Sequence, residues 1–531
     1  MGIPSYFSYI VRNHGEIIKK LAKLNSTVDN LYLDSNSIIY DVYRTISTKN
    51  KSSHDIEVEI YAAICDKIET YISTVKPTKR VIIAFDGVAP VAKLEQQRNR
   101  RYKSSFEKNI IKTYGKIQNE QPVWDQCAIT PGTNFMNNIG VKVNEYFQYK
   151  YNDLNVKEIL VSCPNEAGEG EHKIFEFIRN NEETHKNEIT LIYGLDADLI
   201  MLCLNHLSVS SSIYLYRETP HFIRNLNSNL NPEEQYVINI PELADAIINE
   251  MNNYRTMNGK QKENRLHDYI FLCLFLGNDF MPHIPSINIR TTGINILLNA
   301  YKETLGDTKE YLTDGKNINW KNVRNLVEVL KRDEITNLKK EYVHRRRLEK
   351  HVNSQDETVE EKLNFIPIRN RSIEEYINPY EKGWESRYYK SLFGMEITKE
   401  RKQQICTNYL EALEWTLKYY TTGCYDWKWC YNFNYAPLMY DLYQFIPYFD
   451  VEFVEKKQKE PLEPIVQLSY VLPKHSFDLL PNHISKKLLD TNPQWYDTNC
   501  EFQWAYCKFF WESHVIMKPI EIGELKDIVA H

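Results

Sequence analysis

The chain has 531 residues and a formal net charge of −6, and 26% of its residues are charged. This length exceeds what one hydrophobic core usually serves, so we expect a large domain and a second lobe. The acidic balance excludes a globally basic surface, and any contact with nucleic acid would need local basic patches. The 10 cysteines form no CxxC pair and no zinc-like spacing, which indicates reduced thiols rather than a disulfide framework or a zinc site.

Short apolar runs alternate with helical patterns through the first part of the chain. Strand-like runs occur in NLYLDSNSIIYDVY, RVIIAFDG, VKEILVSC, ITLIYGLDADLIMLCL and SSIYLYRE, and helical patterns in IEVEIYAAICDKIETYIS, AKLEQQRNRRYKSSFEKNIIKTYGKI and EGEHKIFEFIRN. Strands that alternate with helices predict an α/β fold with a largely parallel, helix-covered sheet. No apolar run is long enough to span a membrane and the N-terminus lacks a signal-peptide pattern, so we expect a soluble protein.

The pattern changes in the second part of the chain. Residues 331–372 are charged and poor in apolar side chains, which is typical of a linker or a solvated helix. An aromatic-rich region follows, with GWESRYYKSLFG and YLEALEWTLKYYTTGCYDWKWCYNFNYAPLMYD. We therefore expect a first domain over 1–330, a charged connection over 331–372 and a second region over 373–531.

Seven acidic residues lie where sites form in α/β proteins, at the ends of apolar segments or at a helix start. In an open α/β sheet, ligands bind in the crevice at the carboxyl ends of the strands. Each acid alone is more often a turn former or a helix cap than a ligand. Gly168 and Gly170 would let the backbone approach the site closely. The seven are Asp34, Asp86, Glu169, Glu171, Asp196, Asp198 and Asp279.

Carboxylates gathered this densely repel one another, which raises some of their pKa values. Divalent cations relieve the repulsion, and oxygen ligands favour Mg²⁺ or Mn²⁺ over zinc. Two such ions about 4 Å apart can clamp the attacking water and the leaving oxygen in phosphodiester cleavage. The acids therefore indicate metal-dependent phosphoryl transfer. The alternative, a purely structural acidic cluster, gives no reason for the basic helix that follows Asp86.

That helix is predicted from about Pro90. At about 100° per residue, four side chains share one face about 100° wide, whereas Arg98 and Lys103 point elsewhere. Guanidinium forks and an ammonium suit a terminal phosphate, and a glutamine can donate to it without adding charge. A solvated basic face is the alternative interpretation. The four residues are Lys93, Gln97, Arg100 and Arg101.

Longer motifs carry a resemblance to a known family. They are MGIPSYFSYI, IAFDGVAPVAKLEQQRNRRYKSS, NEAGEGEHKIFEFIR, YGLDADLIML, DYIFLCLFLGNDFMPHIPS and YLEALEWTLKYYTTGCYDWKW, in family order and weakening after about residue 445. The chain resembles the XRN family of 5′→3′ exoribonucleases, in a short form without the long C-terminal additions of larger members. The resemblance implies a PIN/flap-nuclease-like fold: a mixed, mainly parallel sheet flanked by helices, with a second, mostly helical C-terminal lobe.

The resemblance also implies roles for the residues above. The seven acids would bind two Mg²⁺ ions, for which Mn²⁺ can substitute, and the four residues of the basic helix would hold an RNA 5′-monophosphate. The family places a stacking histidine where this chain has Tyr40, which keeps an aromatic face but loses an imidazolium contact. Trp511, with Trp504 as a rival, matches the family's second stacking residue.

The expected function is processive 5′→3′ degradation of single-stranded, 5′-monophosphorylated RNA to nucleoside 5′-monophosphates. We expect a monomer in the cytoplasm, with the nucleus as the alternative, and decapping or other RNA-decay factors as partners. A flap or structure-specific DNA nuclease is disfavoured because MPHIPSINIRTTGINILL lacks the Gly-rich helix–hairpin–helix pattern after GNDF. A catalytically silent RNA-binding scaffold would not need seven carboxylates beside a polyanion.

Overall fold

The computed structural model describes residues 3, 5–24, 26–48, 51–115, 124–252, 256–352, 358–457 and 460–530. Within these residues, a seven-stranded sheet has the order β1-β7-β6-β5-β2-β3-β4. Five neighbouring strands, β2 to β6, pair in parallel, and β7 and β1 add an antiparallel edge. The strands are β1 (Ile18–Lys20), β2 (Asn30–Asp34), β3 (Arg80–Ala84), β4 (Glu158–Ser162), β5 (Ile189–Tyr193), β6 (Ser212–Arg217) and β7 (Tyr236–Asn239).

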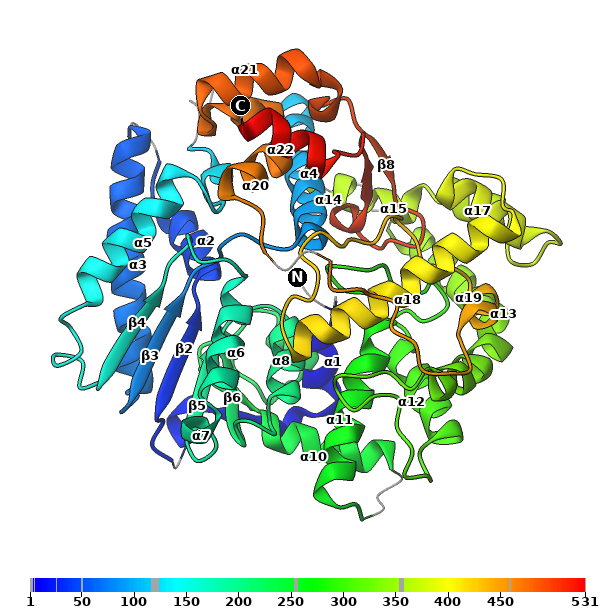
Figure 1. Cartoon of the computed structure of the whole chain (residues 1–531), viewed down its shortest axis with the longest axis horizontal. Helices are drawn as coiled ribbons and strands as arrows, with labels where there is room; N and C mark the ends of the chain where they lie inside the picture. The colour runs from blue at the N-terminus through cyan, green and yellow to red at the C-terminus, as the bar shows by residue number, and fades with distance from the viewer. Residues whose placement is uncertain are drawn as a thin grey trace.

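Helices cover both faces of this sheet, as Figure 1 shows for α3 and α5 on one side and α6 and α8 on the other. Leu31 and Leu33 of β2 pack against the first group of helices, while Tyr32 packs against the second. Such strands, buried on both faces, are typical of parallel sheets. The helices are α1 (Tyr6–Asn13), α2 (Asn36–Thr45), α3 (Ser53–Val75), α4 (Val91–Tyr114), α5 (Asn134–Phe147), α6 (Gly170–Asn180), α7 (Glu182–His185), α8 (Asp198–Asn205), α9 (Ile223–Leu226) and α10 (Ile240–Met251).

The second part of the chain is mostly helical, with one two-stranded ribbon of β8 (Glu501–Gln503) and β9 (His514–Ile516). The mainly parallel, helix-flanked sheet followed by a helical region confirms the predicted fold class. Its helices are α11 (Gly259–Leu274), α12 (Gly293–Thr304), α13 (Trp320–His351), α14 (Val359–Asn364), α15 (Ile366–Arg369), α16 (Ser372–Ile377), α17 (Trp384–Phe393), α18 (Lys399–Thr421), α19 (Met439–Phe445), α20 (Pro464–Val471), α21 (Asn482–Thr491) and α22 (Ile522–Ala530). None of the helices described is long and apolar enough to cross a membrane.

The charged stretch 331–372 is not a free linker or a fully solvated helix. Its first residues continue α13, which begins before position 331, and residues 353–357 lie outside the described part of the chain. Arg345 is buried and donates to the carboxylate of Glu374 at 2.8 and 2.6 Å. A buried charge is costly unless an opposite charge compensates it, so Arg345 and Glu374 are both buried only because they pair with each other. The charge pattern of the sequence did not show that Glu374 is the partner of Arg345. The division into units at 331 and 373 stays a prediction.

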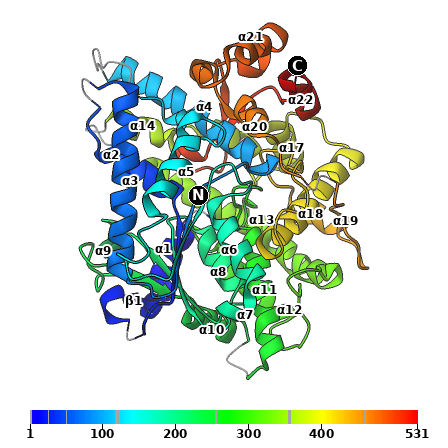
Figure 2. The ribbon, with the colours of Figure 1, turned by 60° about the vertical axis from the view of Figure 1, so that its left-hand side comes forward.

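Helix α4 lies between the sheet and the C-terminal helices, next to α20 in Figure 2. Val91 and Leu94 at its start share a core cluster with Leu468, Trp495 and Leu525. The C-terminal segment therefore covers α4, which begins five positions after Asp86.

Candidate active site

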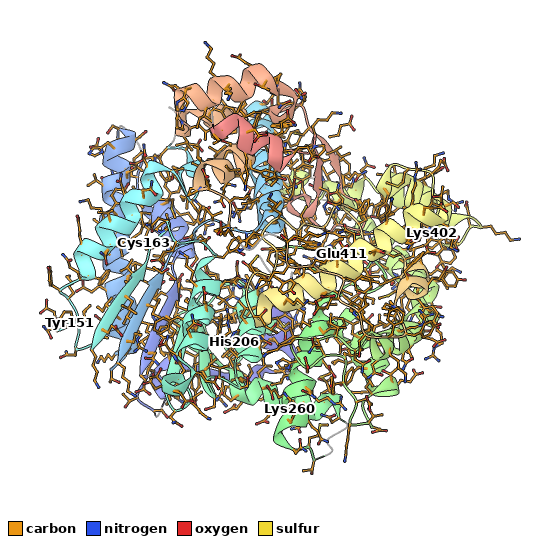
Figure 3. All side chains as sticks on the ribbon, in the orientation of Figure 1. Tyr151, Cys163, His206, Lys260, Lys402 and Glu411 are labelled. Atoms are coloured by element: carbon orange, nitrogen blue, oxygen red, sulfur yellow. The ribbon has the colours of Figure 1, made fainter. Side chains whose placement is uncertain are left out.

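Six of the seven predicted acids lie at the carboxyl edge of the sheet or at a helix start. Asp34 ends β2, Asp86 follows β3, and Asp196 follows β5. Glu169 directly precedes α6, Glu171 lies in its first turn, and Asp198 begins α8. Cys163, which follows β4, marks this edge in Figure 3. The seventh acid corrects the expectation: Asp279 follows the end of the helix α11, because the apolar run before it is helical rather than extended.

The structure brings all seven acids together, and we call them the acid cluster. Burial raises the pKa of Asp34, and the neighbouring charges of Asp86 and Asp196 raise it further. Burial also raises the pKa of Asp198 to about 7, with Asp279 adding to the effect. Carboxylates from the sheet region, and Asp279 from the helical region, therefore lie close enough to shift one another's pKa values.

A glycine at position 170 makes the close approach of α6 to the sheet possible. The backbone N–H of Gly170 donates to Oδ1 of Asp86 at 2.7 Å, and Asn36 Nδ2 donates to Oδ2 at 2.7 Å. A Cβ at position 170 would lie 2.7 Å from Asp34 Oδ1 and 3.0 Å from the carbonyl oxygen of Ala84. Any side chain there would displace the carboxylate, as the sequence predicted for this glycine.

The donor set fits a divalent cation. One oxygen of Glu171, Oε2, is buried and has no hydrogen-bond partner among the described residues. Burial raises the pKa of Glu171, and the charge of Glu169 adds to this. Ligand atoms of Glu169, Glu171 and His172 lie within 4.8 Å of one another. Carboxylate oxygens dominate the cluster, and such hard ligands match Mg²⁺ or Mn²⁺.

Lys93 contacts the acid cluster directly. Its Nζ lies 2.5 Å from Glu169 Oε2 and 2.8 Å from Asp279 Oδ2. Burial lowers the pKa of Lys93, but Asp279 and Glu169 outweigh this and raise it well above its usual value. Burial acts to raise the pKa of Asp279, but the Lys93 ammonium and other positive charge hold it below its usual value. The basic helix and the acids are therefore one electrostatic unit.

The other three residues of the predicted phosphate pocket have different surroundings: Gln97 and Arg101 contact each other, whereas Arg100 faces solvent. Arg101 donates to Thr130 Oγ1 at 2.6 Å and to Gln97 Oε1 at 3.4 Å. Burial lowers the pKa of Arg101, and both Arg100 and Tyr40 are close enough to influence it. Arg100 is exposed. The structure thus gathers Tyr40, Gln97 and Arg101, with Lys93 on the side of the acids.

A cavity of about 1050 Å³ lies against α4, which contributes part of its lining. Asp279, Arg100 and Trp511 are among its lining residues. Trp511 stacks on Phe509 with ring centroids 5.9 Å apart. Trp504 is not among the described residues that line the cavity, and its indole donates to the carbonyl of Asn370 at 2.9 Å. The described lining of the cavity thus includes Trp511 and not Trp504, and the stacking role of either residue stays a prediction.

Sequence reasoning missed the contribution of α18 to this site. The hydroxyl of Tyr419 donates to Glu169 Oε1 at 2.9 Å, although 250 positions separate the two residues. His172 stacks on the Tyr419 ring with centroids 3.7 Å apart. Both residues lie in the motifs that carried the resemblance, but no local pattern connects residues so far apart.

A mainly parallel, helix-flanked sheet with acids at its carboxyl edge places the chain in the PIN/flap-nuclease-like class. A family model described as "XRN 5'-3' exonuclease N-terminus" matches residues 1–219. A second model, described as "Xrn1 helical domain", matches 260–378 and 368–504. The chain belongs to the XRN family.

Relatives with this family name resemble the whole chain at low identity. The 5'-3' exoribonuclease 2 of Arabidopsis thaliana is 26% identical over 100% of this chain and 67% of its own length. The 5'-3' exoribonuclease 2 of Gallus gallus is 27% identical over 92% of this chain and 65% of its own. For the 5'-3' exoribonuclease 1 of Saccharomyces cerevisiae the values are 27%, 91% and 40%. The chain thus spans about two thirds, or less, of these relatives.

Proposed function

We propose that the chain is a processive 5′→3′ exoribonuclease that degrades single-stranded, 5′-monophosphorylated RNA to nucleoside 5′-monophosphates, with Mg²⁺ or Mn²⁺ as cofactor. The observation that carries the proposal is the contact of Lys93 with Glu169 and Asp279, which joins a phosphate-binding type of helix to a cluster of buried carboxylates. RNA is a polyanion, so its phosphates can approach these carboxylates only if positive charge compensates the repulsion. Metal ions at the acids and cationic side chains of the helix would supply that charge.

The acid cluster would hold two divalent cations. When bound, these cations stabilise the charge that develops as water displaces the leaving oxygen at a phosphodiester. The protein's own contribution is placement: Gly170 and Asn36 hold Asp86, and Tyr419 and Lys93 hold the two oxygens of Glu169. Because these donors are fixed by the fold, little reorganisation is needed when the substrate binds.

The basic helix would select the end of the RNA. Arg101 and Arg100 offer guanidinium forks to the terminal phosphate, Gln97 offers an amide, and Lys93 ties this end to the acids. Arg101 is half-buried and fixed by its bond to Thr130, so we expect a cap or a triphosphate to fit poorly. A 5′-hydroxyl end would lack the charge that these groups bind.

Two aromatic residues would hold the first bases. Tyr40 lies close to Arg101, and Trp511 lines the cavity beside Asp279 and Arg100. Aromatic rings combined with cationic side chains suit single strands, because every base has a face that can stack.

Matched RNAs test the proposal. The protein is incubated with Mg²⁺ and one RNA sequence that carries a 5′-monophosphate, a 5′-triphosphate or a 5′-hydroxyl, and products are resolved by length. We expect mononucleotides from the monophosphorylated RNA alone. Asp196→Ala should abolish turnover and leave RNA binding largely intact, whereas the exposed Asp153→Ala should change neither. Equal decay of the three RNAs, or internal cleavage, would contradict the proposal.

A further inference from the structure

The C-terminal end of α18 reaches the acid cluster from the helical part of the chain. In Figure 1 this helix runs from the outer edge of the molecule toward α8 and α6. Tyr419 is only 2% exposed, and its hydroxyl donates to Glu169 Oε1. The following residue, Tyr420, is fully buried, and Asp198 and Glu171 are among the charges that act on its phenol. Two phenols of one helix therefore face the carboxylates.

Packing fixes the direction of the Tyr419 hydroxyl. Its ring stacks on His172 at 3.7 Å and on Trp415 at 4.9 Å, and meets the edge of Phe280 at 5.4 Å. A ring enclosed on several sides cannot turn without disturbing its neighbours.

The hydroxyl and Lys93 together engage both oxygens of Glu169. Tyr419 donates to Oε1, and the Lys93 ammonium lies 2.5 Å from Oε2. A phenol keeps its proton at neutral pH and a carboxylate only accepts, so Tyr419 is the donor of this bond. Glu169 is thereby held in one orientation by groups from two distant segments.

We propose that Tyr419 is a positioning residue of the acid cluster, which orients Glu169 for a divalent cation and makes α18 part of the active site. This inference rests on the proposed function, because it assigns a role toward the same metal site. Groups that hydrogen-bond to ligating carboxylates orient them, and losing one typically lowers metal affinity or activity about 10- to 100-fold. A purely packing role would need only the ring.

Removing only the hydroxyl oxygen of Tyr419 distinguishes a positioning role from a packing role. Tyr419→Phe keeps the ring contacts and removes the donor. Tyr388→Phe is the matched control, because Tyr388 is also fully buried and its hydroxyl donates to a backbone carbonyl, that of Ala436, at 2.8 Å. Both variants are made in the full chain. Mn²⁺ alone is titrated into each protein without RNA, and binding is followed by electron paramagnetic resonance and calorimetry.

We expect Tyr419→Phe to bind Mn²⁺ about 10- to 100-fold more weakly than the wild type, whereas Tyr388→Phe binds like the wild type. The melting temperatures of the two variants should fall by similar amounts. With RNA, Tyr419→Phe should lose kcat at limiting Mn²⁺, recover it at high Mn²⁺ and keep its KM for RNA.

Three other outcomes of these experiments would each overturn a different claim or overturn it for a different reason. Wild-type Mn²⁺ affinity in Tyr419→Phe overturns the positioning role, even if turnover falls. An equal loss of Mn²⁺ affinity in both variants also overturns it, because the effect would then be general destabilisation. A wild-type protein that binds no Mn²⁺ overturns the proposed function itself, and the inference with it.

Discussion

Trp511 and Trp504 lie in different environments although both belong to the aromatic-rich end of the chain. Trp511 lines the cavity, whereas the Trp504 indole is used in a bond to Asn370. Stacking of one base on an aromatic ring is worth about 1–3 kcal/mol. We therefore expect Trp511→Ala to weaken the binding of 5′-phosphorylated RNA by about 5- to 150-fold.

Trp504→Ala is the matched control for this prediction, and it should lower the melting temperature while leaving RNA affinity unchanged. Both substitutions are combined with Asp196→Ala so that binding can be followed by fluorescence anisotropy without turnover. A larger loss of affinity in Trp504→Ala would assign the stacking role to the rival tryptophan.

At the scale of elements, Lys103 fastens the segment that carries Trp511 to α4. Its half-buried ammonium donates to the carbonyl oxygens of Trp511 at 2.6 Å and Ser513 at 2.7 Å. Asn99, one turn earlier, accepts from the backbone N–H of Val515 at 3.0 Å. The helix with the predicted phosphate ligands thus also sets the position of the stacking residue.

We expect Lys103→Met to weaken RNA binding because the Trp511 segment loses its two anchoring bonds. In a double-mutant cycle with Trp511→Ala, the losses should be less than additive, since both changes act on the same contact. Anisotropy with the inactive variants measures each corner of the cycle. Fully additive losses would mean that Lys103 acts on RNA independently of Trp511.

Glu334 joins two other elements, α13 and α19, and its environment makes this junction sensitive to pH. Its carboxylate accepts from the backbone N–H groups of Met439 at 2.6 Å and Tyr440 at 3.1 Å. Burial raises the pKa of Glu334 to about 7 from its ordinary value of 4.5, although these bonds oppose the shift and Asp441 adds to it. The native protein therefore holds this proton more tightly than the unfolded chain does.

The sign of the effect follows from linkage. The contribution of Glu334 to stability is fully present below about pH 4.5 and is lost as pH rises through about 7, by at most about 3 kcal/mol. We expect Glu334→Gln to reduce the fall in the free energy of unfolding between pH 5 and pH 8, measured with urea. The exposed Glu375→Gln serves as control. An identical pH dependence in wild type and Glu334→Gln would contradict the assignment.

At the scale of the whole molecule, local patterning predicts the strands β2 to β6 and the helices α3, α4 and α6, because short apolar runs alternate with longer helical patterns there. It fails for the edge strands β1 and β7, which are only three and four residues long. It also misplaces the approach to Asp279, because a run such as YIFLCLFL is apolar on every side and its period is unreadable.

For the candidate site too, local sequence patterns predict some features and miss others. The acids could be found because each ends an apolar segment or begins a helix, and the helical face of Lys93 because its period is regular. Which neighbours these side chains meet depends on tertiary packing. The bond between Tyr419 and Glu169, and the contact of Lys93 with the acids, join segments that no local pattern connects.

The whole molecule depends on how α4 holds the C-terminal segment, and Arg98 is central to that contact. This buried guanidinium donates to the carbonyl oxygens of Trp495 at 2.7 Å and Lys518 at 3.1 Å. Hydrogen bonds to charged groups contribute about 1.5–3 kcal/mol each, and their loss leaves buried acceptors unpaired. We expect Arg98→Met to lower the melting temperature and to expose the chain beyond Trp495 to limited trypsin digestion.

Activity should fall in the same variant, because α4 begins five positions after Asp86 and its start shares a core with the segment that would be released. Arg387→Met is the control. Arg387 also donates to backbone carbonyls, those of Tyr376 and Ile377 at 2.8 Å, but these contacts lie within the α16–α17 region. It should destabilise the protein without releasing the C-terminal segment. If trypsin cut Arg98→Met and Arg387→Met alike, the bonds of Arg98 would not be what holds the C-terminal segment.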